Sequence, residues 1–445
     1  MNGTSLLLPA LALAAPAAPA ADDLPESYRK QWSDPAAVEL IDRGIERNRK
    51  GDLEIELVDA DGRPAAGVPV KAEQKTHEFL FGCNLFVLGQ LETPERNRRY
   101  EERFLRLFNF ATLPFYWEGT EPEKGELRYA EGSRFLWRRP PPDPLVRWCR
   151  QHGVVPKGHP LLWHAHNPPW LPKDPAELRS LYRKRLEEIA ARYARDIPIW
   201  DVVNESLVCG RNYPLYTEDR AYVAWAFAEV QRLFGPEPLL MINEVTGVSH
   251  QPGEENRYFR QVRSLLEAGV GIEGIGFQVH FFSRKALDSS LRGGAWTPAG
   301  LRDVYERFGR LERPLYVTEI TIPGAGEDGT AVQAEVTRNL YRLWFSIPRM
   351  AGITWWNLGD GTAVQSELGA MGGLLDKDLE PKPAYRVLDD LINRAWKTRV
   401  EGTTDGAGRF AFRGFGGTYE VRAGAARFEA RVAAGRSEKV RWKIP

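Results

Sequence analysis

Short apolar runs alternate with longer helical stretches between residues 75 and 397. These runs, eight in number, read HEFLFGC, FATLPF, VVPKGHPLLW, IPIWDVV, LLMIN, GIGFQVH, PLYVTEI and GITWWN. One helix between them is clearly marked, because Asp174 can cap it, Pro175 suits its first position, and apolar residues repeat at helical spacing from Leu178 to Tyr193. Eight strands that alternate with helices predict an α/β fold of the (β/α)8 TIM-barrel type.

The segments on either side of this barrel have a period-two pattern instead. Residues 51–74 alternate around Asp61-Gly62, which predicts a β-hairpin, and residues 398–445 contain four short strand-like runs separated by glycines. Neither segment is long enough to be stable alone. We therefore expect them to form one small all-β sandwich, with the barrel, residues 75–397, inserted between them. Their D-x-x-G-x-P and TTD-x-x-G-x-F patterns are similar to those of the carboxypeptidase regulatory-like β-sandwich.

The first 21 residues have the pattern of a secretory signal peptide. An apolar, alanine-rich stretch from Leu6 to Ala20 is too short to span a bilayer, and small residues precede two aspartates as at a cleavage site. We expect residues 1–21 to be a signal peptide and the protein to be secreted, extracellular or periplasmic. The alternative is an unstructured tail, because no Lys or Arg precedes the apolar stretch. Residues 22–50 are expected to form a linker or a helical lead-in.

The composition excludes several classes of partner. Lysine plus arginine and aspartate plus glutamate both number 60, so the formal net charge is zero and there is no basic block for nucleic acid or an anionic membrane. Three cysteines are too few for a disulfide scaffold, and Cys83 is expected to be a buried small hydrophobe. We expect a monomer. The 14 Trp, 15 Tyr and 20 Phe indicate a large core and also supply rings on which a sugar can stack.

Polar residues end six consecutive apolar runs. In a (β/α)8 barrel the carboxyl ends of the strands meet at one face, and this face carries the active site. We therefore expect these carboxylates, imidazoles, amides and indoles to converge. They are Trp163, His164 and His166, then Asn204 and Glu205, Asn243 and Glu244, Gln278 and His280, Thr318 and Glu319, and finally Trp356, Asn357 and Asp360.

Two carboxylates at the ends of the fourth and seventh strands lie across the predicted mouth from one another. Such a pair suits glycoside hydrolysis with retention, in which the two carboxyl groups are about 5–5.5 Å apart. Glu205 follows apolar residues and can be the acid, while Glu319 can be a nucleophile kept ionised by His280 and His164. Asn204 is placed to bind a sugar hydroxyl. Taken singly, an Asn-Glu pair is more often a helix cap and a Thr-Glu pair a salt-bridge partner, so the prediction depends on their convergence.

Five segments together resemble glycoside hydrolase family 10, the family of retaining endo-β-1,4-xylanases. They are GHPLLWHAHNPPWL (158–171), WDVVNE (200–205), GIGFQVHFF (274–282), YVTEI (316–320) and LLDKDLEPKPAYRVL (374–388), in the order that the family has. The resemblance implies a retaining xylanase acting on a plant-type β-linked polysaccharide or its fragments. It implies Glu205 as acid/base and Glu319 as nucleophile. It further implies sugar-binding or orienting roles for His164, Asn204, Gln278 and His280, with Trp356 as the floor of the sugar site.

The sequence departs from this family where the sugar on the non-reducing side should bind. Before the TEP tripeptide, xylanases carry a Glu-Asn…Lys set, and here Thr112, Leu113 and Tyr116 stand in its place. His166 replaces a glutamine, and a second tryptophan is missing from residues 359–364. Lost polar contacts change substrate discrimination by large factors. Xylan is therefore the leading substrate, and a rebuilt pocket could instead select a decorated chain, a different sugar or exo-attack.

Four further tryptophans have either a structural or a sugar-binding interpretation. Trp148 and Trp344 occupy helical positions and are expected in the core. Trp117 and Trp170 lie in loops after the second and third strands, where a core role and a sugar-stacking role remain equally open.

Two other functions compete with hydrolysis. His164-Ala165-His166 at a strand end is also the pattern of a metal site, as in metal-dependent amidohydrolase barrels, but the fifth strand ends in Asn243-Glu244 without the histidine that such a site needs. We therefore expect no metal and no organic cofactor. A barrel that binds sugar without turning it over is the third possibility. The altered pocket favours it, and the presence of Glu205 and Glu319 argues against it.

Overall fold

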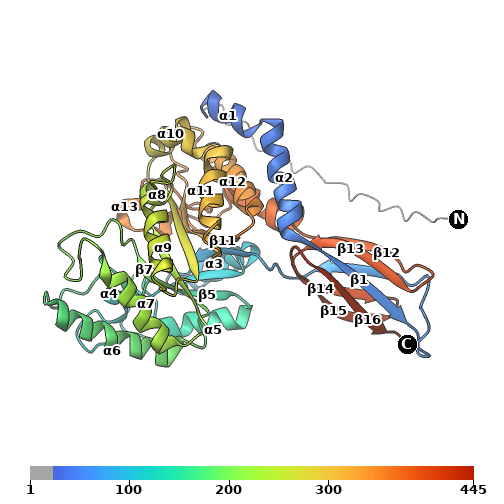
Figure 1. Ribbon diagram of the computed structural model, residues 1–445, viewed down its shortest axis with the longest axis horizontal. Helices are drawn as coiled ribbons and strands as arrows, with labels where there is room; N and C mark the ends of the chain where they lie inside the picture. The colour runs from blue at the N-terminus through green and yellow to red at the C-terminus, as the bar shows by residue number, and fades with distance from the viewer. Residues whose placement is uncertain (1–23) are drawn as a thin grey trace.

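The computed structural model describes residues 24–445 and shows a barrel with a smaller β-sandwich projecting from one side of it (Figure 1). The expected signal peptide, residues 1–21, lies outside the described residues. No helix in the described part of the chain combines the length and the apolar character needed to cross a membrane.

The barrel is a closed parallel sheet with helices around it. Its strands follow the order β5-β4-β3-β11-β10-β9-β8-β7, and pairing of Lys157 with Ile199 and of Gly158 with Trp200 closes the sheet between β5 and β7. The short β6 (Leu162–Trp163) adds to β7. Each main strand coincides with one of the predicted apolar runs, which confirms the (β/α)8 fold. They are β3 (Leu80–Asn84), β4 (Phe110–Pro114), β5 (Val155–His159), β7 (Ile199–Asn204), β8 (Leu239–Glu244), β9 (Gly274–His280), β10 (Leu315–Thr321) and β11 (Met350–Trp355).

Closure of the barrel requires a glycine at position 158. A Cβ there would lie 2.1 Å from the Trp200 ring, so only glycine allows β5 to come this close to β7. Trp200 is fully buried and packs edge-on against Phe115 and Phe234. The same close approach fixes the strand that carries His159, one residue further along.

Helices cover the outside of the barrel. The marked helix is α6 (Pro175–Tyr193), and the Asp174 carboxylate accepts from the backbone N–H groups of Ala176 and Glu177, which confirms the predicted cap. Trp148, Trp344 and Cys83 are buried in the core as expected. The larger helices are α3 (Pro94–Leu107), α5 (Pro142–His152), α7 (Ala221–Phe234), α9 (Arg257–Glu267), α10 (Arg284–Arg292), α11 (Pro298–Gly309), α12 (Gly329–Ser346) and α14 (Pro383–Asp390). Short helical segments are α4 (Trp117–Thr120), α8 (Thr246–Ser249), α13 (Gln365–Leu368), two 3₁₀ turns (Gly294–Trp296 and Asp360–Thr362) and a π-helical turn (Leu391–Ala395).

The sandwich consists of two sheets built from both terminal segments. One sheet has the order β13-β1-β16 and the other β12-β2-β14-β15. Leu53, Ile55, Tyr419 and Val421 are fully buried between the sheets. The strands are β1 (Lys50–Val58), β2 (Pro69–Gln74), β12 (Arg399–Thr403), β13 (Arg409–Phe415), β14 (Gly417–Ala423), β15 (Ala426–Val432) and β16 (Ser437–Lys443).

The predicted hairpin in residues 51–74 is wrong. A tight turn does form, since the Gly62 N–H donates to Asp59 O and the Asp59 N–H to Arg63 O, but β1 and β2 belong to different sheets. Each of the two strands pairs with strands of the C-terminal segment instead, β1 with β13 and β16 and β2 with β12 and β14. That segment also contains five strands, one more than its glycine spacing predicts.

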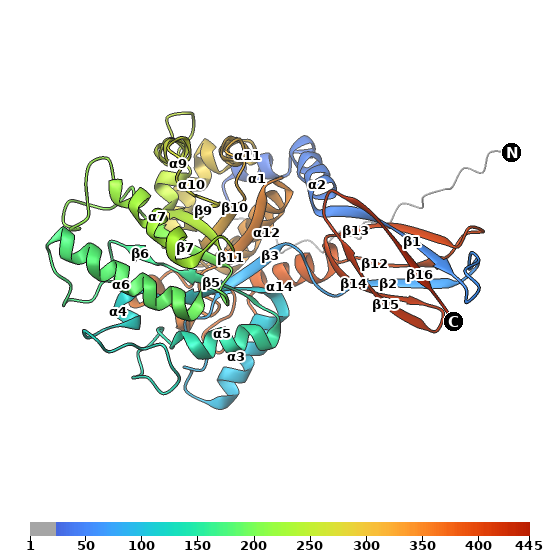
Figure 2. The ribbon, with the colours of Figure 1, turned by 60° about the horizontal axis from the view of Figure 1, so that its bottom comes forward.

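Residues 26–49 form two helices that attach to the barrel. They are α1 (Glu26–Trp32) and α2 (Pro35–Arg49). The buried Arg49 guanidinium donates to the carbonyl oxygens of Phe345 and Ile347, just before β11 begins. The sandwich is therefore joined at the end of the barrel where strands start. Figures 1 and 2 show it projecting from the barrel in both views, and Figure 1 places it opposite α4 and α13, which follow strand ends.

Arg49→Ala tests the importance of this junction. The substitution removes the Arg49 hydrogen bond to the buried Phe345 carbonyl oxygen and leaves Ile347 O with the Met350 N–H as its donor, which should lower the free energy of unfolding by about 2 kcal/mol. Denaturant unfolding measures the change. The control is Arg47→Ala. Arg47 is an exposed arginine of the same helix, so its substitution should change the free energy of unfolding by less than about 0.5 kcal/mol. Equal effects of the two substitutions would contradict this account of the junction.

Candidate active site

A cleft of about 900 Å³ opens at the carboxyl ends of the barrel strands. Strands β5, β7, β9 and β10 end in it, together with the segments that follow β4, β6, β8 and β11. Nine of the residues predicted from the sequence line it. They are Tyr116, Trp163, His166, Asn204, Glu205, Gln278, His280, Glu319 and Trp356.

Glu319 is a buried carboxylate surrounded by hydrogen-bond donors. Its Oε1 accepts from Asn243 Nδ2 at 2.8 Å, and its Oε2 lies 3.0 Å from His280 Nε2. His159 Nε2 lies 4.0 Å from Oε1. Burial alone would raise the pKa of Glu319, but the His280 hydrogen bond and the neighbouring His159 and Lys157 side chains outweigh it and hold the pKa below its ordinary value. This environment favours the ionised carboxylate.

Glu205 has the opposite environment. Burial raises the pKa of its carboxyl group, and the nearby Glu319 charge raises this pKa further. Hydrogen bonds from Gln278 Nε2 at 2.9 Å and Trp163 Nε1 at 3.0 Å lower it, but the net shift is upward. The residue has φ of 58° directly after β7, a conformation that costs energy for a non-glycine residue, and its N–H donates to Asn243 O at 2.9 Å. The strained backbone aims the side chain into the cleft.

A chain of amides connects the two carboxyl groups. Asn243 Nδ2 donates both to Glu319 and to Asn204 Oδ1, each at 2.8 Å, and Gln278 Nε2 lies 3.4 Å from Asn204 Oδ1 and 2.9 Å from Glu205. The two glutamates therefore face the same space with contrasting proton affinities. One protonated and one ionised carboxyl group is the combination that general acid and nucleophilic catalysis need.

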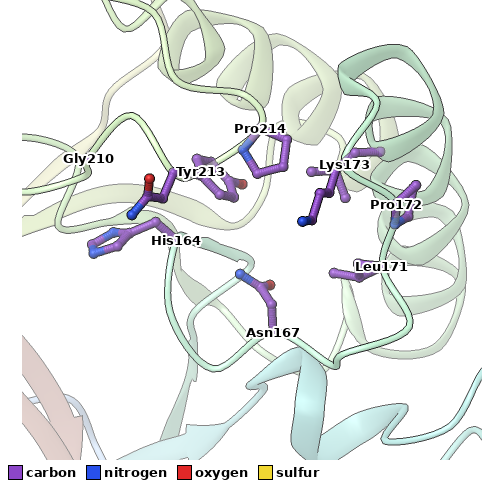
Figure 3. A pocket seen from close by; sticks show the side chains of 10 residues that line it. His164, Asn167, Leu171, Pro172, Lys173, Gly210, Tyr213 and Pro214 are labelled. Carbon is purple, nitrogen blue, oxygen red and sulfur yellow. The ribbon is translucent and has the colours of Figure 1, made fainter.

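The expected role of His164 is wrong, and His159 takes that place. His164 lines a separate pocket of about 380 Å³ with Asn167, Lys173 and Tyr213 (Figure 3), and it makes no contact with Glu319. His159 lies in the cleft. The difference arises because β5 ends at His159, which lines the cleft, whereas His164 follows the short β6 and lines the other pocket.

His159 is fixed from behind by a buried ionic group that sequence reasoning also missed. The Asp201 carboxylate lies 2.7 Å from His159 Nδ1 and 2.6 Å from Lys157 Nζ, and all three side chains are buried. Lys157 and Asp201 hold this imidazole with its Nε2 toward Glu319. The signal in the sequence was the presence of charged residues inside apolar runs, where a barrel interior can accept them only as partners.

Trp117 and Trp170 do not line the cleft, which contradicts a sugar-stacking role there. Trp117 is buried in the core, and its indole N–H donates to Glu121 Oε2 at 3.0 Å. Trp170 is half-buried and packs edge-on against Trp117, with ring centroids 5.9 Å apart. Both stabilise the segment that follows β4.

Arg138 and Arg139 line the cleft near Tyr116, and no strand-end pattern predicts them. The loop that carries them follows α4, and their neighbours along the chain, Phe135 and Trp137, are exposed. Only the folded structure brings this loop to the cleft.

The His164-Ala165-His166 segment does not form a metal site. His166 lines the cleft and contacts Glu118, whereas His164 faces the other pocket. Within residues 24–445, no group of three or more His, Cys, Asp or Glu side chains is arranged to hold a metal ion.

A (β/α)8 barrel with two glutamates of contrasting proton affinity at its strand ends defines a glycoside hydrolase. Residues 93–391 match the model of Glycosyl hydrolase family 10. The chain belongs to this family.

Several proteins are similar to this chain. It is 26% identical over 400 residues to anti-sigma-I factor RsgI6 of Acetivibrio thermocellus, with 88% of this chain and 46% of the relative covered. It is 25% identical over 343 residues to endo-1,4-beta-xylanase B of Thermotoga neapolitana, with 72% and 89% covered. The chain thus spans less than half the length of the anti-sigma factor. The structure of xylanase 10B from Thermotoga petrophila in complex with xylobiose has a TM-score of 0.58 and 24% identity, and covers 71% of this chain and 94% of its own.

The contrast between the two glutamates can be measured by titration. Because Glu205 holds its proton to higher pH than an ordinary glutamate and Glu319 loses its proton at lower pH, there is a window in which Glu205 is protonated and Glu319 charged. Gln278→Leu removes a donor that stabilises ionised Glu205, so the pKa of Glu205 should rise further and the upper edge of this window should move to higher pH. Carbon-13 NMR of labelled glutamates measures both groups.

The matched control is Gln231→Leu, an exposed glutamine of helix α7 that does not line the cleft, which should leave both titrations unchanged. A Glu205 that titrates below Glu319 would contradict the assignment of acid and nucleophile.

Proposed function

We propose that the protein is a retaining endo-β-1,4-xylanase-like hydrolase whose site for the non-reducing part of the substrate differs from that of xylanases. The observation that supports it most is the pair of Glu205 and Glu319 in one cleft, with raised and lowered pKa values respectively. Several of the similar proteins are named xylanases. The substrate class is a β-linked plant-type polysaccharide or its oligosaccharides.

The reaction would proceed by double displacement. The Glu319 carboxylate attacks the anomeric carbon while Glu205 gives its proton to the departing glycosidic oxygen. In the second half, Glu205, now ionised, removes a proton from a water molecule that attacks the same carbon and releases Glu319. The Asn243 and His280 donors hold Glu319 in place through both halves. Asn204, beside Glu205, is positioned to bind a sugar hydroxyl.

The Tyr116 end of the cleft supports a substrate other than plain xylan. Thr112 and Leu113 are fully buried, so neither reaches a sugar. Tyr116 packs against Phe86 and Trp163 and presents a ring where xylanases have a lysine. A decorated chain or a different glycoside therefore fits this pocket better than an unmodified xylose chain does.

Three further properties complete the proposal. The Leu6–Ala20 stretch supports a signal peptide and secretion. The early turn and the later TTD-x-x-G-x-F strand support kinship of the sandwich with carboxypeptidase regulatory-like modules. The protein acts as a monomer on its polysaccharide, without a cofactor.

Two substitutions test the catalytic assignment. Glu319→Gln removes the nucleophile and should lower kcat on an aryl β-xyloside at least about 10⁴-fold. Glu205→Gln should slow hydrolysis of xylan far more than that of a xyloside with a good leaving group, because such a group departs without a proton. Reducing-sugar release and aryl-alcohol release measure the two activities.

The control is Glu312→Gln, an exposed glutamate just before the same strand β10, which should retain full activity. Absence of hydrolysis by the unaltered protein on xylan, arabinoxylan and aryl glycosides would overturn the proposal in favour of a sugar-binding barrel.

A further inference from the structure

Two arginines form one wall of the cleft at its Tyr116 end. Arg138 and Arg139 both line the cavity, beside Tyr116, Trp356 and Glu367. They come from the loop between α4 and α5, and not from a barrel strand. None of the catalytic steps described above uses them.

Arg138 is a buried cation without an ionic partner. Its side chain is 3% exposed, and within residues 24–445 no carboxylate lies within 4.0 Å of its guanidinium nitrogens. Nη1 donates to Asn357 Oδ1 at 2.8 Å, while Nε has no hydrogen-bond partner among the described residues. Burial lowers the pKa of Arg138 to about 10, so the group is charged at neutral pH. Such a charge is costly to bury unless something pairs with it.

Glu367, an acidic residue that also lines this end of the cleft, does not form an ion pair with Arg138. Glu367 Oε2 accepts from Asn357 Nδ2 at 2.8 Å, so Asn357 stands between the carboxylate and the guanidinium. The Asn357 amide thus holds both charged groups in place and keeps them from forming a direct ion pair. Among the described residues, Nη2 of Arg138 has no hydrogen-bond partner, and unlike Nε it is not fully buried.

Arg139 is fixed beside Arg138 with its plane over an aromatic ring. Its guanidinium carbon lies 3.9 Å from the centroid of Tyr116, and Nη1 donates to Arg138 O at 3.0 Å. Its closest acid is Glu118, with Oε1 3.7 Å from Nη2, and that oxygen already lies 2.5 Å from His166 Nδ1. Glu118 is therefore shared between two partners. The two arginines of this wall thus have two carboxylates nearby, Glu118 and Glu367, but neither carboxylate forms a direct ion pair with Arg138.

A carboxylate is the group that these donors recognise best. Arginine binds a planar carboxylate through two parallel N–H donors, and such charge-assisted hydrogen bonds are stronger than those to neutral hydroxyls. An unmodified neutral sugar would leave the buried Arg138 with only the indirect charge of Glu367, at the cost of having no direct ionic partner. A substrate that brings its own negative charge to this end would remove that cost.

We propose that the Tyr116 end of the cleft binds the carboxylate of a uronic acid on the substrate, with Arg138 as its principal partner and Arg139 as the second. The proposal rests on the proposed function, because the uronic acid belongs to the glycan that Glu205 and Glu319 would cleave. It identifies the decorated substrate as an acidic β-linked chain.

Binding to an inactive variant tests this without any need for turnover. In the Glu319→Gln background, calorimetry compares a neutral xylo-oligosaccharide with the same oligosaccharide carrying one glucuronic acid group. The acidic ligand should bind at least about tenfold more tightly, and this preference should decrease as salt is added. A sulfated oligosaccharide of the same length is the third ligand, and equally tight binding of it would overturn the assignment to a uronic acid.

Substitutions at position 138 assign the preference to a residue. Arg138→Gln should abolish the preference and leave the affinity for the neutral ligand within about twofold, while Arg138→Lys should retain part of it, since it keeps the charge without the fork. Arg134→Gln, an exposed arginine of the same loop that pairs with Glu123 and Glu126, should leave all affinities unchanged. Thermal unfolding of each variant verifies that it is folded.

Two results would overturn the proposal. One is equal affinity of the parent variant for neutral and acidic ligands. The other is an Arg138→Gln variant that binds both ligands more weakly by the same factor, which would assign Arg138 a purely structural role beside Phe86 and Asn357. Failure of the proposed function is recognised separately, by the absence of aryl glycoside hydrolysis in the unaltered protein.

Discussion

The hydrogen bonds of the Asn243 amide are the interaction on which the whole site depends. Its Nδ2 group donates to Glu319 and to Asn204, and its Oδ1 accepts from Thr318 Oγ1 at 2.6 Å, so every polar atom of the side chain is used. Gly276 provides the room, because a Cβ at that position would lie 2.6 Å from Asn243 Oδ1. A single buried amide therefore fixes the nucleophile relative to the residue before the acid, and a loss of its geometry would disturb both.

The barrel holds further buried polar groups that are tolerable only because each is partnered. Lys157, Asp201 and His159 form one such group behind Glu319, with no exposure to solvent at Lys157 and Asp201. Glu244 is another, with its carboxylate receiving the backbone N–H groups of Leu207 and Val245, while burial raises its pKa to about 7. These bonds hold the turn after Glu205. Their net contribution to stability is small, but they restrict the site to one arrangement.

The sequence predicted what depends on periodicity and on strand ends. Barrel strands are buried on both faces, so each appears as an apolar run, and the residues at their carboxyl ends had to converge once the barrel was assumed. Glu205, Glu319, Gln278 and His280 were found for this reason. His159 was missed because it lies inside a run, one residue after the glycine that closes the barrel, and the more conspicuous His164 follows the same run. The β1–β2 hairpin was wrong for a related reason, since a turn motif specifies a local reversal and not the sheet in which the next strand pairs.

Arg138 and Arg139 illustrate the part that no pattern could supply. They stand in a loop whose neighbours are exposed, and a basic pair there is ordinarily a solvated surface. Only the packing of that loop against Phe86 and Tyr116 makes one of them a buried cation in the cleft. The two ends of the cleft therefore differ in kind. Glu319 receives direct hydrogen bonds from Asn243 and His280, which hold it in one arrangement in every turnover. At the Tyr116 end, Arg138 has no directly paired carboxylate, and a substrate that supplies one would be favoured over a substrate that does not.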